Sequence, residues 1–448
     1  MRAGRQRVAV SAAPHRVRER LTLRPGVRPA EVWAWAMYDF ANSGYTTVVI
    51  TAIFNAYFVA SVAGNAPWAT FAWTAALAVS YLALVFTSPL IGAYADAQVA
   101  KKRLLAVTTV GCVLCTALLA FVAPGDLWLA IVLVALSNYF FGSGENIVAA
   151  FVPELAEGHA LGRVSGWGWA LGYVGGLVTL GLCLGYVSWA AAQGAAAADY
   201  VPVTMLITAA IFAAASLPTF LVLRERGRGR PEGGTAPVTA AFARVAYTLR
   251  RARHYRDLWR FLACLVFYQA GVQTVVVLAA VYAQQAMGFG TEETLVLIMI
   301  VNITAAVGAL AFGHVQDWLG HRTTLAIILV GWGVTVLIAW VAQGPALFWL
   351  AANLVGVCLG SSQSAGRALI GYLSPARRHA EFFGLWGLAV KLSSVLGPLS
   401  YGTVTWATGG DHRLAILCTG LFFVAGLALL MGVDVERGHR AAGGELER

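Results

Sequence analysis

Long stretches without a charged residue constrain this chain more than any other feature. Residues 40–95, 104–125 and 164–198 contain no Asp, Glu, Lys or Arg, and 59% of the 448 residues are hydrophobic. Charged residues make up only 12% of the chain, whereas soluble domains carry about 25%. Because about 20 apolar residues in a helix cross the ~30 Å hydrocarbon core of a bilayer, we expect an all-α polytopic membrane protein.

Twelve transmembrane helices can be placed along the sequence. They cover residues 33–62, 69–95, 104–123, 127–152, 164–190, 202–223, 258–284, 293–314, 323–342, 345–371, 382–406 and 412–433. Of the 31 Lys and Arg residues, eight precede the first span and ten lie around the connection between the sixth and seventh. The positive-inside rule then places both termini in the cytoplasm. We expect a multi-pass protein of the inner (cytoplasmic) membrane, whose positive charge requires no nucleic acid.

The segments outside the spans are short and basic. We expect cytoplasmic tails at residues 1–31 and 435–448, and a basic cytoplasmic linker at 224–257. Apolar residues recur at helical spacing in this linker, opposite arginines: Val238, Phe242, Val245 and Leu249. This pattern predicts an amphipathic helix on an anionic membrane face.

The sequence carries no signature of catalytic chemistry. All six cysteines fall within predicted spans, where Cys112 and Cys115 are better explained as buried thiols than as a redox or metal pair. We find no metal-ligand cluster, no nucleophile motif and no ATP-binding loop. We therefore expect no enzyme, no cofactor and no metal, and a functional monomer.

Two internal repeats divide the chain. GAYADAQVAKKR (92–103) follows the second span and GHVQDWLGHR (313–322) follows the eighth, each with glycine four residues before aspartate. A second echo pairs GSGENIVAAFVPEL (142–155) with GSSQSAGRALIGYLSP (360–375). The repeats predict two pseudo-symmetric six-helix halves, which we place at residues 32–223 and 258–434.

The repeated glycine–aspartate–basic loop resembles the signature loop of the major facilitator superfamily. More narrowly, several segments look like the vacuole-effluxer-type family, whose fungal members are associated with amino-acid efflux from the vacuole after autophagy. These segments are YDFANSGY (38–45), SGWGWALGYVGG (165–176), FYQAGVQTV (267–275), QSAGRALIGYLSP (363–375) and EFFGLWGLAVKLSSVLGP (381–398). The resemblance implies the major facilitator fold, with a central cavity lined mainly by helices 1, 4, 7 and 10.

The two signature loops are our candidates for a conformational gate. Asp96 and Asp317 are expected to hold these loops against neighbouring helix ends, where charge-assisted hydrogen bonds contribute about 1.5–3 kcal/mol each. The gate residues are Gly92, Asp96, Lys101, Gly313, Asp317 and Arg322.

Polar side chains recur every three or four residues on the four helices expected to line the cavity, so that each set shares a face. Span 1 carries Asp39, Ser43 and Thr46; span 4 carries Asn138, Gly142 and Glu145; span 7 carries Gln269, Gln273 and Gln284; span 10 carries Asn353, Gln363 and Arg367. Each stripe alone could instead serve as interhelical hydrogen bonding. Together they favour a hydrated cavity.

Four charged side chains lie inside spans, each roughly 10–14 Å from the cytoplasmic end of its helix. The first half supplies the acids Asp39 and Glu145, and the second half supplies the bases Arg367 and Lys391. Because buried charges in a bilayer are tolerated when paired or facing water, we predict that Glu145 pairs with Arg367 or Lys391 when the cytoplasmic side is closed. For Asp39 two interpretations stay open: it fixes the start of span 1, or it exchanges a proton and couples transport.

These patterns predict a secondary active transporter that works by alternating access. The expected substrate and coupling residues are Asp39, Asn42, Ser43, Asn138, Glu145, Gln269, Gln273, Gln363, Arg367 and Lys391. A cavity with both carboxylates and cations suits a small polar or zwitterionic solute, such as an amino acid, in proton-coupled efflux. The alternatives are an exporter of drugs, natural products or lysolipids on the same fold, and a membrane sensor or enzyme.

Overall fold

The computed structural model describes residues 23–158, 160–226, 255–285, 287–289 and 291–443. These residues form helices and connecting turns, with one isolated β-bridge between Leu23 and Ala156. In chain order the helices are α1 Pro29–Tyr45, η1 Thr46–Ala52, α2 Phe54–Tyr57, η2 Phe58–Val62, α3 Ala69–Gln98, α4 Lys101–Leu118, η3 Leu119–Phe121, α5 Leu127–Ala149, α6 Val152–Leu155, α7 Ala160–Ala192, α8 Ala197–Val222, α10 Arg256–Gln285, α11 Thr291–Leu319, α12 His321–Val341, α13 Pro345–Leu373, α14 His379–Ala407, α15 His412–Met431 and α16 Val435–Gly443.

Twelve of the described helical segments are long and apolar enough to cross a membrane. This finding confirms the predicted number of spans. The first span begins at Pro29 rather than at residue 33, because proline is well suited to the first position of a helix. The fourth span is interrupted, since α5 ends at Ala149 and the short helix α6 follows it.

The first span departs from regular α-helix in its second half. Residues Thr46–Ala52 and Phe58–Val62 form π-helical turns around the short α2. The hydroxyl groups of Thr46 and Thr47 each donate a hydrogen bond to the carbonyl of Ser43. These bonds compete with the regular backbone hydrogen bonds of the helix. Such π turns inside helices are frequent at functional sites, and the first one starts at Thr46, the last residue of the polar stripe that begins at Asp39.

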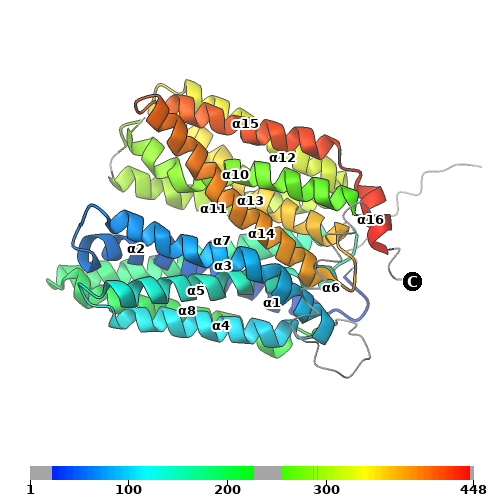
Figure 1. Cartoon of the computed structure of the whole chain (residues 1–448), viewed down its shortest axis with the longest axis horizontal. Coiled ribbons are helices and arrows are strands. Elements are labelled where there is room, and N and C mark those ends of the chain that lie inside the picture. Colours follow the sequence, from blue (N-terminus) through cyan, green and yellow to red (C-terminus); the bar gives the residue numbers. More distant parts are fainter. Residues whose placement is uncertain (1–22, 159, 227–254, 286, 290, 444–448) are drawn as a thin grey trace, which may run out of the picture.

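The helices form two halves that lie one above the other in Figure 1, with α1 to α8 below and α10 to α15 above. The halves meet along two seams, where α3 packs against α14 and α7 packs against α11. Glycines permit this close approach. A methyl group at Gly166 would meet the backbone of Ala309 across one seam, and one at Gly384 would meet the backbone of Ser88 across the other.

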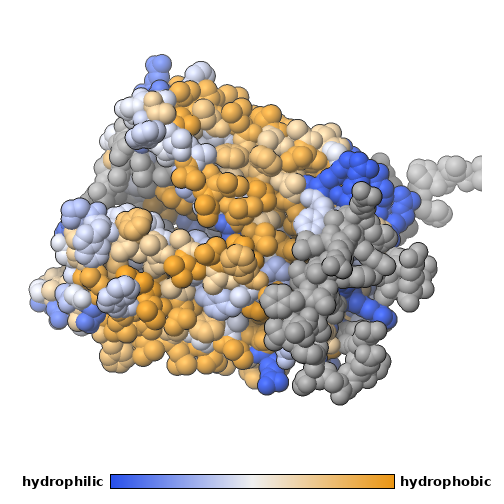
Figure 2. All heavy atoms as spheres, in the orientation of Figure 1, coloured by the Kyte–Doolittle hydropathy of each residue, from blue (hydrophilic) through white to orange (hydrophobic). Residues whose placement is uncertain are grey.

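Apolar side chains cover the outer surface of both halves. Figure 2 shows hydrophobic residues across the middle of the visible face, with hydrophilic residues gathered toward its two ends. Large side chains such as Phe71, Leu221 and Trp406 are exposed on this surface. Exposure of this kind is expected for helices whose solvent is lipid.

The two ends of the bundle differ. We call the end that carries α6, α16 and the residues Lys101, Arg163 and Arg322 the basic end; it lies to the right in Figure 1. Among the described residues, the ion pairs and glycine contacts that join the halves lie toward this end. At the opposite end the surface is hollowed between the halves (Figure 2). The structure is therefore a state closed at the basic end.

The segments that flank the spans are ordered where they are described. Helix α16 begins the predicted C-terminal tail and is tied to the start of α10, because Arg437 donates two 2.7 Å hydrogen bonds to Asp257. The predicted amphipathic helix in the linker lies outside the described residues, as does most of the N-terminal tail.

Candidate functional site

A buried ion pair joins the two halves near the middle of the bundle. Arg367 on α13 places Nη1 2.6 Å from the Asp39 carboxylate on α1. Both side chains are almost wholly buried. Sequence analysis anticipated that acids of the first half would meet bases of the second, and did not assign Asp39 its partner.

The rest of the Arg367 guanidinium is held by α1 and α7. It donates from Nε to the Ser165 hydroxyl at 3.0 Å and from Nη2 to the Ser165 carbonyl at 2.8 Å. Its planar face lies 4.8 Å from the ring centre of Trp35 and 5.3 Å from that of Trp169, which adds cation–π attraction. All of these partners belong to the N-terminal half, so the guanidinium links the halves through several contacts at once.

Gly168 explains how a guanidinium and a carboxylate fit between these helices. A methyl group at this position would contact the Asp39 carboxylate, the Arg367 guanidinium and the ring of Trp35. Gly172 and Gly175, farther along α7, lie against the α1 backbone and allow close helix packing. Gly168 additionally makes room for the ion pair.

A second ion pair crosses between the halves from α5 to α14. Lys391 Nζ lies 3.6 Å from the Glu145 carboxylate and 5.2 Å from the ring centre of Tyr81. The Glu145 side chain is 24% exposed, so water screens this pair more than the first. Of the two partners predicted for Glu145, the structure selects Lys391.

The polar stripes continue beyond the ion pairs. Gln269 on α10 donates a 2.8 Å hydrogen bond to Gln363 on α13, one helical turn from Arg367. Asn42 and Ser43 lie about one turn beyond Asp39 on α1. Gln273, a turn beyond Gln269, is partly exposed. Asn42, Ser43 and Gln363 therefore lie on the two helices of the central pair, and Gln269 joins α10 to them through Gln363.

Asn138 has a different environment. It is buried and donates a hydrogen bond to the Ser80 hydroxyl on α3. About two helical turns farther along α5, Asn146 donates a 3.1 Å hydrogen bond to the Ser88 hydroxyl. These bonds fasten α5 to α3 within one half. This is the interhelical hydrogen bonding that a polar stripe also predicts.

Several buried polar atoms near the pairs have no hydrogen-bond partner among the described residues. Two are acceptors, Asn42 Oδ1 and Gln269 Oε1, and two are donors, the indole nitrogens of Trp169 and Trp386. A buried polar group without a partner costs about 1–3 kcal/mol. Such groups, on helices α1, α7, α10 and α14, can be satisfied by water or by a polar solute.

The first signature loop holds the start of a helix in the other half. Asp96 accepts a 2.9 Å hydrogen bond from the backbone of Glu381 in the first turn of α14, and its other oxygen lies 3.2 Å from Lys101. Lys101 also contacts Glu154 of α6 at 2.7 Å. Gly92 lets the loop approach, because a methyl group there would meet the backbone of Ala380.

The second signature loop makes the corresponding contact. Asp317 at the end of α11 accepts from the backbone of Arg163 at 3.2 Å and from its Nε at 3.0 Å, at the start of α7. Gly313 packs on Gly162 of the same helix. Negative charge is favoured at a helix N-terminus, so both aspartates stabilise contact between the halves in this state.

Comparison with known families matches residues 68–443 to the family described as "Vacuole effluxer Atg22 like". The chain belongs to this family. The uncharacterized MFS-type transporter YxiO of Bacillus subtilis (strain 168) is 28% identical over 411 residues, which cover 90% of this chain and 94% of that protein. Autophagy-related protein 22-1 of Aspergillus fumigatus is 26% identical over 331 residues, 67% of this chain and 53% of its own length. The chain thus spans about half the length of the fungal relative.

Solved structures show the same fold. The major facilitator superfamily proton:xylose symporter XylE superposes with a TM-score of 0.71 at 12% identity, covering 90% of this chain and 95% of that one. The resemblance and the fold predicted from sequence are therefore confirmed. This Atg22-like protein is a secondary transporter of the major facilitator superfamily and not an enzyme.

Two basic residues of this Atg22-like chain hold the ends of other helices, a role that the sequence did not suggest. Lys102 donates from Nζ to the carbonyl of Leu223 at 2.7 Å, just after α8, and Arg322 donates to the carbonyl of Met431 at 2.6 Å, the last residue of α15. Each basic residue thus caps the last span of its own half. Arg322 therefore contacts the neighbouring helix end rather than Asp317.

The start of the linker completes the network behind Lys101. Arg226 donates its backbone N–H to Glu154 at 2.8 Å, and its guanidinium lies 2.8 Å from Glu31 of α1. Sequence analysis missed Glu154 and Glu31. The surplus of basic residues at this end was the available signal, since buried lysine and arginine require nearby carboxylates.

Proposed function

We propose that this transporter carries a small zwitterionic solute, such as an amino acid, in exchange for or together with protons. The basic end lies in the cytoplasm, so both termini are cytoplasmic, and the physiological direction is efflux. Support for this orientation comes from the concentration of lysine and arginine at the basic end. The working unit is the monomer, because the polar helices face the seam within one chain.

The buried pair between Asp39 and Arg367 is the observation that carries the proposal. A zwitterion has one charge to match each member: its carboxylate can take the place of Asp39 at the guanidinium, and its ammonium group can pair with Asp39 whenever that side chain is ionised. Arg367 is suited to this role because its fork of donors matches a carboxylate. The partnerless amide and indole groups on α1, α7, α10 and α14 can satisfy the remaining polar atoms of the solute.

Proton coupling follows from the same pair. Protonation of Asp39 removes the negative charge that holds Arg367 across the halves, 2.6 Å away. The halves are then freer to separate at the basic end, and the solute carboxylate can bind the released guanidinium. Both ligands act on one bistable contact, which is the condition for coupling two binding events.

The test is flux in proteoliposomes with an imposed pH gradient, read against radiolabelled amino acids and other polar metabolites. We expect accumulation of at least one zwitterion to follow the gradient. Asp39→Asn should keep solute exchange, although with weaker solute binding because the ammonium group loses its anionic partner, and should lose gradient-driven accumulation. Glu157→Gln, which changes an exposed carboxylate at the basic end, is the matched control and should behave as wild type.

Two results would contradict the proposal. If no zwitterion is exchanged while an uncharged or lipophilic solute is, the substrate class is wrong. If Asp39→Asn accumulates solute along the pH gradient with the wild-type slope, Asp39 is structural and Glu145 becomes the better proton carrier.

A further inference from the structure

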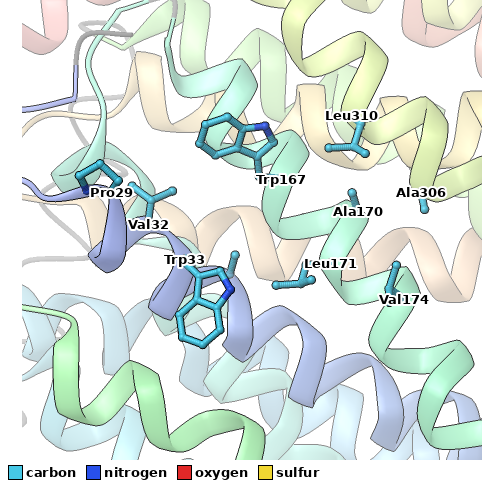
Figure 3. A pocket seen from close by; sticks show the side chains of 10 residues that line it. Pro29, Val32, Trp33, Trp167, Ala170, Leu171, Val174, Ala306 and Leu310 are labelled. Carbon is cyan, nitrogen blue, oxygen red and sulfur yellow. The ribbon is translucent and has the colours of Figure 1, made fainter.

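An apolar groove lies on the flank of the bundle where α1, α7 and α11 meet, away from the central ion pairs. Its volume is about 440 Å³, within the ~300–1,000 Å³ range of small-molecule sites. Its walls include Trp33 of α1, Trp167 and Val174 of α7, and Ala306 and Leu310 of α11 (Figure 3). All of its lining side chains are hydrophobic.

The groove opens toward lipid. Trp33 is 55% exposed, Val174 42% and Leu310 41%, all on the apolar outer surface. In Figure 3 the two tryptophans lie toward the Pro29 side of the groove, and Val174 lies at the other side. Tryptophan is enriched at the level of lipid headgroups. The groove therefore runs from the headgroup level at the basic end into the acyl-chain region.

Two arginines lie close in sequence to lining residues at the headgroup side of the groove. Arg28 directly precedes Pro29 at the mouth of the groove; its side chain is 62% exposed and only loosely paired, 3.9 Å from Glu31. Arg163 lies one helical turn before Trp167 and is one-quarter exposed, although it contacts Asp317. An occupant with an apolar tail and an anionic head matches this distribution of surface and charge.

We propose that the groove holds an acyl chain of an anionic phospholipid, with its phosphate against Arg28 and Arg163. One wall of the groove, formed by Ala306 and Leu310, belongs to α11, which packs against α7 where Gly166 meets Ala309. The lipid therefore binds the state closed at the basic end better than a state in which these helices separate. A ligand with such a preference shifts the equilibrium toward the state that it binds.

Native mass spectrometry of the purified full-length protein tests the site, with phosphatidylglycerol and phosphatidylcholine of identical chains as probes. We expect the wild type to retain one phosphatidylglycerol more tightly than phosphatidylcholine. Arg28→Gln should weaken phosphatidylglycerol about fivefold, the effect of one basic residue at a lipid surface. It should weaken phosphatidylcholine less, because the choline group of that lipid offsets the charge of its phosphate.

Two variants that fill the groove from different helices test whether the retained lipid lies in it. Ala306→Phe and Val174→Phe should each abolish the retained lipid. Val307→Phe is the matched control, because Val307 is an exposed neighbour on α11 outside the groove. Thermal denaturation in detergent identifies which variants are folded.

Each remaining outcome bears on the proposal. The site would be overturned if Ala306→Phe or Val174→Phe is folded and still retains phosphatidylglycerol as the wild type does. It would also be overturned if Val307→Phe loses this lipid as fully as the groove variants do. Equal retention of the two lipids by the wild type, with no effect of Arg28→Gln, would overturn the headgroup contact and hence the anionic lipid.

Discussion

The pair between Asp39 and Arg367 sets how firmly this transporter closes at its basic end. Asp39→Asn leaves the guanidinium buried with no anion, at a site where Nη1 was 2.6 Å from the carboxylate. Removing one partner of a buried pair costs about 3–5 kcal/mol. If the arginine meets water once the halves separate, the ratio of the state closed at the basic end to the open state falls roughly a hundred-fold to a few thousand-fold.

Spin labels at Thr70 and Thr408 measure this shift. Both positions are exposed at the opposite end of the bundle, near the start of α3 and the end of α14. Double electron–electron resonance should report a long distance in the wild type and a shorter one in Asp39→Asn, as the opposite end closes. Arg367→Gln should act similarly.

The double variant decides whether the pair is the cause. Removing both charges leaves no uncompensated ion, so Asp39→Asn combined with Arg367→Gln should return most of the population to the wild-type distance. Two residues in contact show such non-additive coupling. The reasoning is refuted if the double variant shifts the distribution by the sum of the single effects, or if Asp39→Asn leaves it unchanged.

Three further predictions concern the neighbouring contacts. Gly168→Ala places a methyl group against the central pair and should destabilise the closed state by about 1–3 kcal/mol, with transport reduced; Gly181→Ala, which meets open space on the same helix, should transport normally. Glu145→Gln and Lys391→Gln should each shift the label distance less than Asp39→Asn, because their pair is longer and partly hydrated; an equal or larger shift would contradict this ranking. Asp96→Asn can still accept from the Glu381 backbone but loses its charge, so the same distance should shift only partly, and no shift would show that the loop charge is dispensable.

The sequence by itself determined the number of spans and the two-half organisation. Both depend on local composition: a run of apolar residues cannot remain in water, and a helix is the structure that satisfies its backbone in lipid. The signature loops were likewise evident from the repeated glycine and aspartate at positions such as Asp96 and Asp317. The family resemblance rested on the same local motifs.

The tertiary structure decided which charges meet. Asp39, Glu145, Arg367 and Lys391 were all identified from sequence as buried charges of matching depth, yet only the structure joins Asp39 to Arg367 and Glu145 to Lys391. Depth follows from counting residues along a helix. Pairing depends on the rotation of each helix about its axis, which is set by packing against several neighbours.

The same limit applies to the residues that sequence analysis missed. The sequence does not show what Gly168, Ser165 and Glu154 contact, because each acts through a partner far along the chain. That partner is the central ion pair for the first two and Lys101 for the third. The groove on the flank is formed by apolar residues of three helices that individually look like any lipid-facing surface. Such sites arise only where separate segments meet, so local composition determines which helices form while packing determines what they bind.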